Sequence, residues 1–291
     1  MAGIKELRGR ITSVGNIKQI TRAMEMVATT KLRRFQDRAM SSRPYTEEVS
    51  GLVGRLAAVL GDSVGDRPLF KEGPGERTLC LLVSSDRGLC GAYNTNLFRS
   101  MEAWLDGRDD EVDFFVYGRK AAAYLKKRGL HMEQFLTEPQ LESVDFRNAA
   151  VTARMLQQEF LSGKYKEVVL FYSAFESMVK YVPTQVQFLP ISPDAFAGSE
   201  GDEGNADVIL EPDAEAIFDS LIPRYLETRT YNALLEALTS EYASRRFAMK
   251  NATDAATDMQ KVLRGIYNRK RQENITKDLL DIVGGAEAVS G

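Results

Sequence analysis

The feature that most constrains this chain is a pair of long apolar stripes, one near each end. The first stripe begins with Ile4, Leu7, Ile11 and Val14, and the second covers 221–266. Because apolar residues recur every three or four positions in both, each stripe is typical of a coiled-coil seam. The second helix would be on the order of 100 Å long, which a globular domain of this size does not need. We therefore expect one antiparallel coiled coil, with the C-terminal helix projecting past its partner.

The first stripe also has an irregularity. It skips three residues after Val14 and resumes at Ile17, Ile20, Met24 and Val27. Such a skip is typical of a stammer, a local overwinding of the coil.

Prolines and glycines predict the ends and bends of these helices. Pro44 should kink or interrupt the first helix, and Pro223 should bend the second. The second helix should begin near Pro212 and end at the glycine pair 284–285.

Between the two stripes the hydrophobic period changes. Short apolar runs at 78–83, 112–117, 168–172 and 184–189, with a weaker one at 132–136, alternate with helical patterns at 94–105, 119–128 and 146–161. Strands that alternate with helices predict a mostly parallel sheet covered by helices. The predicted fold is thus a coiled coil with an inserted Rossmann-like α/β domain. Its parts are an N-terminal coiled-coil helix at 1–60, the α/β domain at 76–193 and a long C-terminal helix at 211–288.

Charge is unevenly distributed along the chain. The formal net charge of −3 argues against a dedicated nucleic-acid-binding protein. The stretch 18–38 is strongly basic, whereas 194–215 carries many acidic residues and no Lys or Arg. A locally basic stripe indicates an anionic partner surface or simply a solvated face.

Targeting and redox features are sparse. The N-terminal residues show no apolar core of a secretory signal, and no stretch approaches the length of a membrane span. The two cysteines, Cys80 and Cys90, form neither a disulfide framework nor a zinc-ligand set, which fits a reducing compartment.

An α/β domain raises the possibility of a nucleotide enzyme, but the usual motifs are absent. The loop 84–94 lacks the three-glycine dinucleotide fingerprint, and no phosphate-binding loop sequence occurs in the chain. His131 is the only histidine, and it falls at a helix-to-strand turn with no implied triad partner. Cys90 near a helix start is more simply a small residue in a tight turn. We therefore predict no catalytic residue, metal site or cofactor.

Four ordered blocks of sequence carry a family resemblance. They are IKQITRAMEMVATTKLRR at 17–34, SSDRGLCGAYNTNL at 84–97, SRRFAMKNATD at 244–254 and ITKDLLDIVGGA at 275–286. Together they span nearly the whole chain, and each resembles a signature of the ATP synthase gamma subunit family. One departure is Asp278, where the family usually has Glu.

The resemblance implies a mechanical role. The coiled coil would turn inside a ring of alternating alpha and beta subunits and hold the three catalytic beta sites in different states. The α/β domain would lie at the foot, against the epsilon subunit and the membrane ring of c subunits. The chain would be peripheral on the cytoplasmic face of the bacterial inner membrane, without inserting into it. No thiol switch is expected, since the regulatory insertion with its cysteine pair is not apparent.

The resemblance also implies roles for particular residues. Beta-subunit contacts would come from Lys18, Arg22, Met24, Lys31, Arg33, Arg34, Cys90, Arg271, Gln272 and Thr276. An apolar bearing would hold Ile282 and Val283. Packing within the coiled coil would use Ile20, Val27, Met249, Ala252, Ala256 and Met259.

Two other interpretations remain at this stage. The chain could be an α/β enzyme that binds a nucleotide or small molecule and dimerises through its helices. It could also be a helical adaptor that binds lipid through 18–38. The first predicts ligand binding by the isolated chain, and the second predicts lipid binding.

Overall fold

The structure is a computed structural model that describes residues 3–192 and 213–290, and these residues form two compact units. The helical unit is Met1–Ala28 with Arg245–Gly291, and the sheet unit is Thr29–Ser244. Most of the predicted acidic loop, and the predicted helix start at Pro212, lie outside the described residues.

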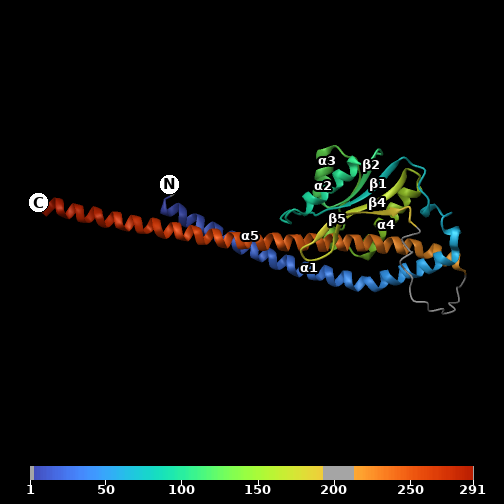
Figure 1. Cartoon of the computed structure of the whole chain (residues 1–291), viewed down its shortest axis with the longest axis horizontal. Coiled ribbons are helices and arrows are strands. Elements are labelled where there is room, and N and C mark those ends of the chain that lie inside the picture. Colours follow the sequence, from blue (N-terminus) through green and yellow to red (C-terminus); the bar gives the residue numbers. More distant parts are fainter. Residues whose placement is uncertain (1–2, 193–212, 291) are drawn as a thin grey trace. The chain divides into compact units, whose positions relative to one another are not determined.

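Two long helices contribute to both units (Figure 1). They are α1, Ile4–Leu60, and α5, Ala214–Ser290. Pro44 and Pro223 lie inside them and interrupt neither helix, because a single proline removes only one backbone hydrogen bond. The glycine pair at 284–285 does not end α5, contrary to prediction, since an interior glycine costs only about 1 kcal/mol.

The two helices are antiparallel within each unit. In the helical unit the hydroxyls of Thr21 and Thr253 lie 2.8 Å apart, and the Gly15 backbone faces the side chain of Gln260. In the sheet unit the rings of Phe35 and Tyr242 stack with centroids 5.4 Å apart. Residue numbers rise along one helix as they fall along the other, which confirms the predicted antiparallel pairing.

The seam of α1 keeps one unbroken rhythm, so the predicted stammer is wrong. Its most buried residues are Leu7, Ala28, Leu32, Phe35, Val49, Val53 and Leu56, all on one series of three- and four-residue steps. Half-buried residues fill that series between Leu7 and Ala28, including Thr21 and Glu25. The apolar residues leave the seam at Ile17 while the helix itself continues regularly. Polar side chains take their place in the seam.

The sheet unit contains five strands in the order β3-β2-β1-β4-β5. Four strands are parallel: β1 (Arg77–Val83), β2 (Val112–Tyr117), β3 (Met132–Leu136) and β4 (Tyr165–Phe175). The fifth, β5 (Tyr181–Leu189), is an antiparallel edge strand paired with β4. The predicted mostly parallel, Rossmann-like sheet is confirmed.

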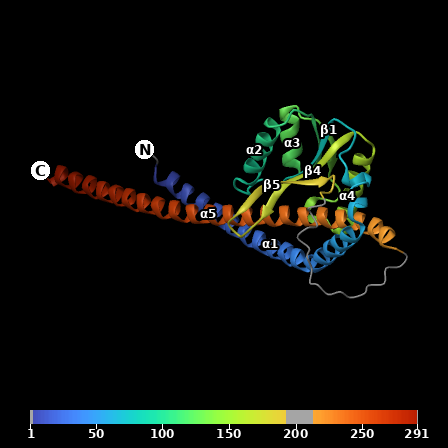
Figure 2. The ribbon, with the colours of Figure 1, turned by 45° about the vertical axis from the view of Figure 1, so that its right-hand side comes forward.

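Helices cover both faces of this sheet (Figure 2). On one face α2 (Tyr93–Asp106) and α3 (Arg119–Arg128) pack over alternate strand residues such as Leu82 and Val116. On the other face Tyr117 points to α4 (Phe146–Leu161), where its hydroxyl lies 2.8 Å from that of Thr152. Short 3-10 turns lie at Gly61–Val64, Pro68–Phe70 and Leu141–Ser143, the last named η3.

Candidate functional surfaces

The carboxyl ends of the strands are where a Rossmann-like fold would bind a nucleotide. Here side chains of the loop after β1 accept hydrogen bonds from the free backbone amides at the start of α3. The backbone N–H of Arg119 donates to the Asp86 carboxylate at 3.1 Å, and that of Ala121 donates to the Ser84 hydroxyl at 2.8 Å. A phosphate at this helix start would meet an aspartate that already occupies the anion position.

The crevice between β1 and β4 is also filled, because α5 is bonded to the loop that follows β1. The Ser244 hydroxyl donates to the Cys90 carbonyl at 2.6 Å, and the Tyr93 hydroxyl donates to the Ala237 carbonyl at 3.1 Å. The Cys90 side chain itself is only 2% exposed. This geometry gives no support to the nucleotide-enzyme interpretation.

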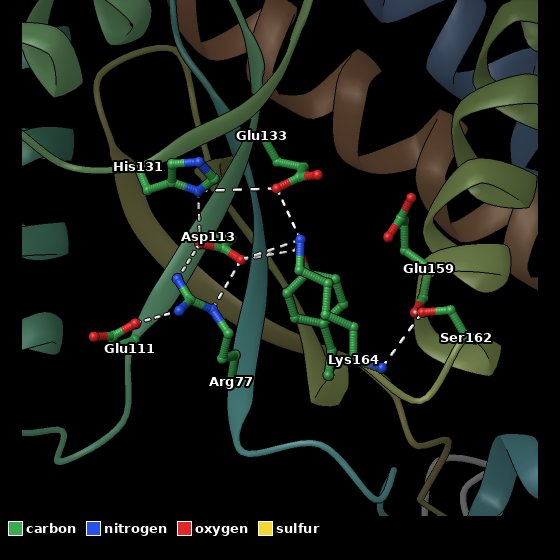
Figure 3. Close-up of polar contacts among 9 residues, drawn as sticks. Arg77, Glu111, Asp113, His131, Glu133, Glu159, Ser162 and Lys164 are labelled. Carbon is green, nitrogen blue, oxygen red and sulfur yellow. Dashed lines mark hydrogen bonds and ion pairs between the residues drawn. The ribbon is translucent and has the colours of Figure 1, made fainter.

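The amino ends of the strands carry a dense ionic cluster around Asp113 (Figure 3). This carboxylate is buried on β2 and accepts hydrogen bonds from Arg77, from the Tyr165 hydroxyl at 3.0 Å and from His131 Nδ1 at 2.8 Å. Burial would raise the pKa of Asp113, but the hydrogen bonds, led by that from Arg77, outweigh it and hold the pKa below its usual range.

The same cluster brings together three side chains that could bind a metal ion. Ligand atoms of Asp113, His131 and Glu133 lie within 4.8 Å of one another. However, Lys164 Nζ lies 2.8 Å from Glu133, and Arg77 is already paired with Asp113. Two cations therefore neutralise the carboxylates that a metal would need. The cluster fits an ion-pair network that joins β1, β2, β3 and the start of β4.

Large apolar side chains are exposed over the helical unit. On α1 they are Ile17, Ile20, Met26 and Val27, and on α5 they are Phe247, Met259, Val262, Ile266, Ile275, Leu279, Leu280, Ile282 and Val283. Every residue from 271 to 286 is exposed. Extended apolar surface of this kind marks an interaction site.

The predicted packing residues divide into two groups. Met249 and Ala256 are buried at 5% and 7% exposure, and Ala252 is half-buried. Ile20, Val27 and Met259 are 55–59% exposed, so their predicted packing in the coiled coil is wrong. They lie one helical step away from the seam, which Thr21 and Thr253 occupy instead.

A cationic groove lies in the sheet unit between α1, α5 and the start of α4. Its volume is about 650 Å³, and its lining includes Arg33, Arg34, Arg38, Phe146 and Tyr231. Arg33 and Arg34 are exposed. Arginines around an open groove with aromatic walls suit an acidic partner segment.

The other predicted contact residues lie in varied surroundings. Arg22, Arg271, Gln272 and Thr276 are exposed, and Lys18 and Met24 are half-buried. Lys31 forms an ion pair with Glu142 of η3. The exposed tip of the Cys90 turn is Leu89, which has a left-handed φ of 62°. Sequence reasoning missed both Glu142 and Leu89, because neither lies in an apolar or charged pattern.

The chain is similar to a known protein family over nearly its whole length. The family model described as ATP synthase matches residues 3–289. ATP synthase gamma chains of Cytophaga hutchinsonii and Desulfosudis oleivorans are 39% and 40% identical, with both chains of each pair fully covered. The chain belongs to the ATP synthase gamma chain family.

Solved structures agree with this fold. The central stalk of the Tetrahymena thermophila mitochondrial ATP synthase, in a structure with its c-ring, has a TM-score of 0.59 at 26% identity and covers 80% of this chain and 99% of its own. A chain of the Euglena gracilis mitochondrial ATP synthase has a TM-score of 0.66 at 19% identity, and the match covers 98% of this chain and 94% of that one. A gamma chain is a non-catalytic subunit of the central stalk, which accounts for an α/β domain without an open nucleotide crevice.

Proposed function

We propose that this chain is the rotating shaft that couples ion flow across a membrane to ATP synthesis and hydrolysis at the beta subunits. The observation that carries the proposal is the helical unit, where α5 runs on as a fully exposed helix over 271–286. This end of the helix exposes Ile275, Leu279, Leu280, Ile282 and Val283, and exposed apolar surface of this extent fits a surrounding protein partner. The catalytic head around a shaft supplies such a partner.

The end of α5 would be the axle tip. Ile282 and Val283, at 68% and 58% exposure, would turn in an apolar bearing of the head. Arg271, Gln272 and Thr276 are exposed about two to three turns earlier and would contact beta-subunit loops. Exposed apolar residues of the shaft, such as Ile20, would face the catalytic head rather than the seam.

The basic side of α1 would meet an acidic lever loop of beta. Arg33 and Arg34 offer their guanidinium groups at the cationic groove of the sheet unit. Lys18, Arg22 and Met24, which lie in the helical unit, would also contact beta. Lys31 would join this contact only by leaving Glu142. The turn that holds Cys90 would contact beta through its exposed residues, since the thiol itself is buried.

The remaining partners would be the alpha subunits, the epsilon subunit and the membrane ring of c subunits. No helix in the described part of the chain is both long and apolar enough to cross a bilayer. We place the chain at the cytoplasmic face of a bacterial inner membrane, held there by the ring.

The first test is co-expression with cognate alpha and beta subunits, followed by size-exclusion chromatography and an ATPase assay. We expect one copy of this chain for each three alpha–beta pairs, and ATPase activity only when it is present. A chain that elutes alone and leaves ATPase unchanged would contradict the shaft.

A second test concerns the groove. Arg33→Glu with Arg34→Glu should reduce ATP-driven ion pumping, because repulsion replaces attraction at the acidic loop. The matched control is Lys126→Glu with Lys127→Glu, which makes the same charge change on exposed residues of α3. Equal pumping by the two double variants would show that the groove has no such partner.

A further inference from the structure

The segment 141–146, made of η3 and the start of α4, follows α1 through three evenly spaced contacts. Lys31 forms an ion pair with Glu142, Arg38 donates to the Val144 carbonyl at 2.8 Å, and the ring of Tyr45 meets Phe146 edge-on with centroids 6.2 Å apart. The α1 residues are seven apart, so they lie on one face of the helix two turns from each other. Their partners are alternate residues of the segment.

Both ends of the segment also reach α5. The Tyr242 hydroxyl donates to the second oxygen of Glu142 at 2.6 Å. The ring of Tyr231 meets Phe146 edge-on, with centroids 5.6 Å apart. Glu142 and Phe146 thus each contact α1 and α5 together.

The segment is itself fixed to the sheet unit. Leu141 and Val144 are 2% and 1% exposed, so its other side is buried. Asp145 caps α4 through a capping box with Asn148, which sets where that helix starts. The helix α4 in turn packs on β2 through Thr152. Movement of the sheet would therefore be passed to the segment.

We propose that residues 141–146 are a strap that fastens the helix pair to the α/β domain and transmits twist between them. Glu142 and Phe146 are its two positioning residues. This inference rests on the shaft function, because only a rotating chain needs to pass torque from its α/β domain to its helices.

The chemistry of Glu142 suits a permanent fastening. Burial would raise the pKa of Glu142, but hydrogen bonds from Lys31 and Tyr242 outweigh it and lower that pKa. The carboxylate therefore stays charged at neutral pH. Removing it would take away the ion-pair partner of Lys31 and the carboxylate that accepts from Tyr242, and hydrogen bonds to charged groups are among the stronger ones.

The test uses the assembled complex with Glu142→Ala and Phe146→Ala combined. With the catalytic head immobilised and a probe on the α/β domain, we expect wider angular fluctuation of the probe than in the parent complex. Hydrogen exchange of amides in 31–45 should become roughly tenfold faster, since α1 loses charge-assisted contacts. ATP hydrolysis should continue while ion pumping per ATP falls.

The matched control is Glu102→Ala, which breaks an ion pair with Arg128 between α2 and α3 and touches neither long helix. It should leave fluctuation and exchange unchanged. If the double variant fails to assemble, Glu142→Gln keeps the shape of the side chain and removes its charge. We expect it to widen the fluctuation beyond that of the parent complex, but less than the double variant does.

Unchanged fluctuation and unchanged exchange in these variants would overturn the strap. That result is distinct from failure of the shaft function, which would show as a parent chain that neither assembles with the head nor supports ATPase activity.

Discussion

One helix, α5, has two different environments in the two units. No residue from Tyr225 to Arg245 is exposed, so this part of the helix is covered on all sides. All of it except Arg245 belongs to the sheet unit. Over 246–270 of the helical unit, the buried residues are Met249, Thr253 and Ala256, and half-buried ones extend the same seam. Over 271–286 every residue is exposed.

The difference separates two ways in which a helix is stabilised. From Tyr225 to Ser244 α5 is a core element, where polar side chains such as Glu227 are buried beside apolar ones such as Leu234, and the apolar ones supply the hydrophobic stabilisation. In the helical unit a narrow seam, partly polar at Thr21 and Thr253, holds the pair together. The apolar residues that could have strengthened this seam, such as Ile20, are left on the outside for a partner.

The largest expected effect compares leucine truncation in the two regions. Leu234→Ala removes a side chain that is 1% exposed and should lower the free energy of unfolding by about 2–5 kcal/mol. Leu280→Ala, at 66% exposure, should change it by less than about 0.5 kcal/mol. Chemical denaturation of both variants measures the contrast. Equal losses would mean that the end of α5 is packed within the chain.

The second effect compares two neighbouring alanines in the helical unit. Ala256 is buried in the seam, whereas its neighbour Ala255 is exposed. Ala256→Trp should cost about 1–3 kcal/mol through overpacking, splay the pair and uncouple hydrolysis from ion transport. Ala255→Trp should leave the helix pair intact, as thermal unfolding followed by circular dichroism would show. Unchanged ion pumping in the Ala256 variant would contradict the seam.

The sequence predicts the sheet unit well because its signals are local. Short apolar runs bounded by turns placed β1, β2 and β3 within one residue of their observed ends, and buried strands leave few other solutions. The sequence predicted the seam of α1 less well. Its apolar residues change faces at Ile17, and a stripe cannot tell a surface kept for a partner from a surface packed within the chain.

The sites show the same limit. Family motifs indicated the basic side of α1, but the pairing of Lys31 with Glu142 joins residues 111 positions apart. A local sequence pattern does not predict a contact between residues so far apart in the chain. Burial of Cys90 was likewise invisible, since a small residue in a glycine turn can face either way.

The smallest expected effect is the loss of stability at low pH, which should be greater in the sheet unit than in the helical unit. Hydrogen bonds keep the pKa of Asp113 below its usual range, so its contribution to stability is present above an unfolded-state pKa of about 3.9 and is lost as pH falls through the lowered folded-state value. Asp110 behaves alike: burial would raise its pKa, but hydrogen bonds led by Arg108 outweigh it and lower the pKa to about 2.

Both aspartates lie in the sheet unit, at the amino ends of its strands. Hydrogen exchange between pH 5 and 2 should therefore show protection falling first in β1 and β2, after correction for the intrinsic pH dependence of exchange. Amides of 249–267 should lose less protection through the early part of this range, because the buried seam residues Met249, Thr253 and Ala256 carry no carboxylate and Glu25 of α1 is only half-buried. In the Asp113→Asn variant, the acid-dependent loss in β2 should shrink, since that side chain no longer binds a proton. Earlier loss of protection in 249–267 than in β2 would mean that the seam, rather than the ionic cluster, is the acid-sensitive part of the chain.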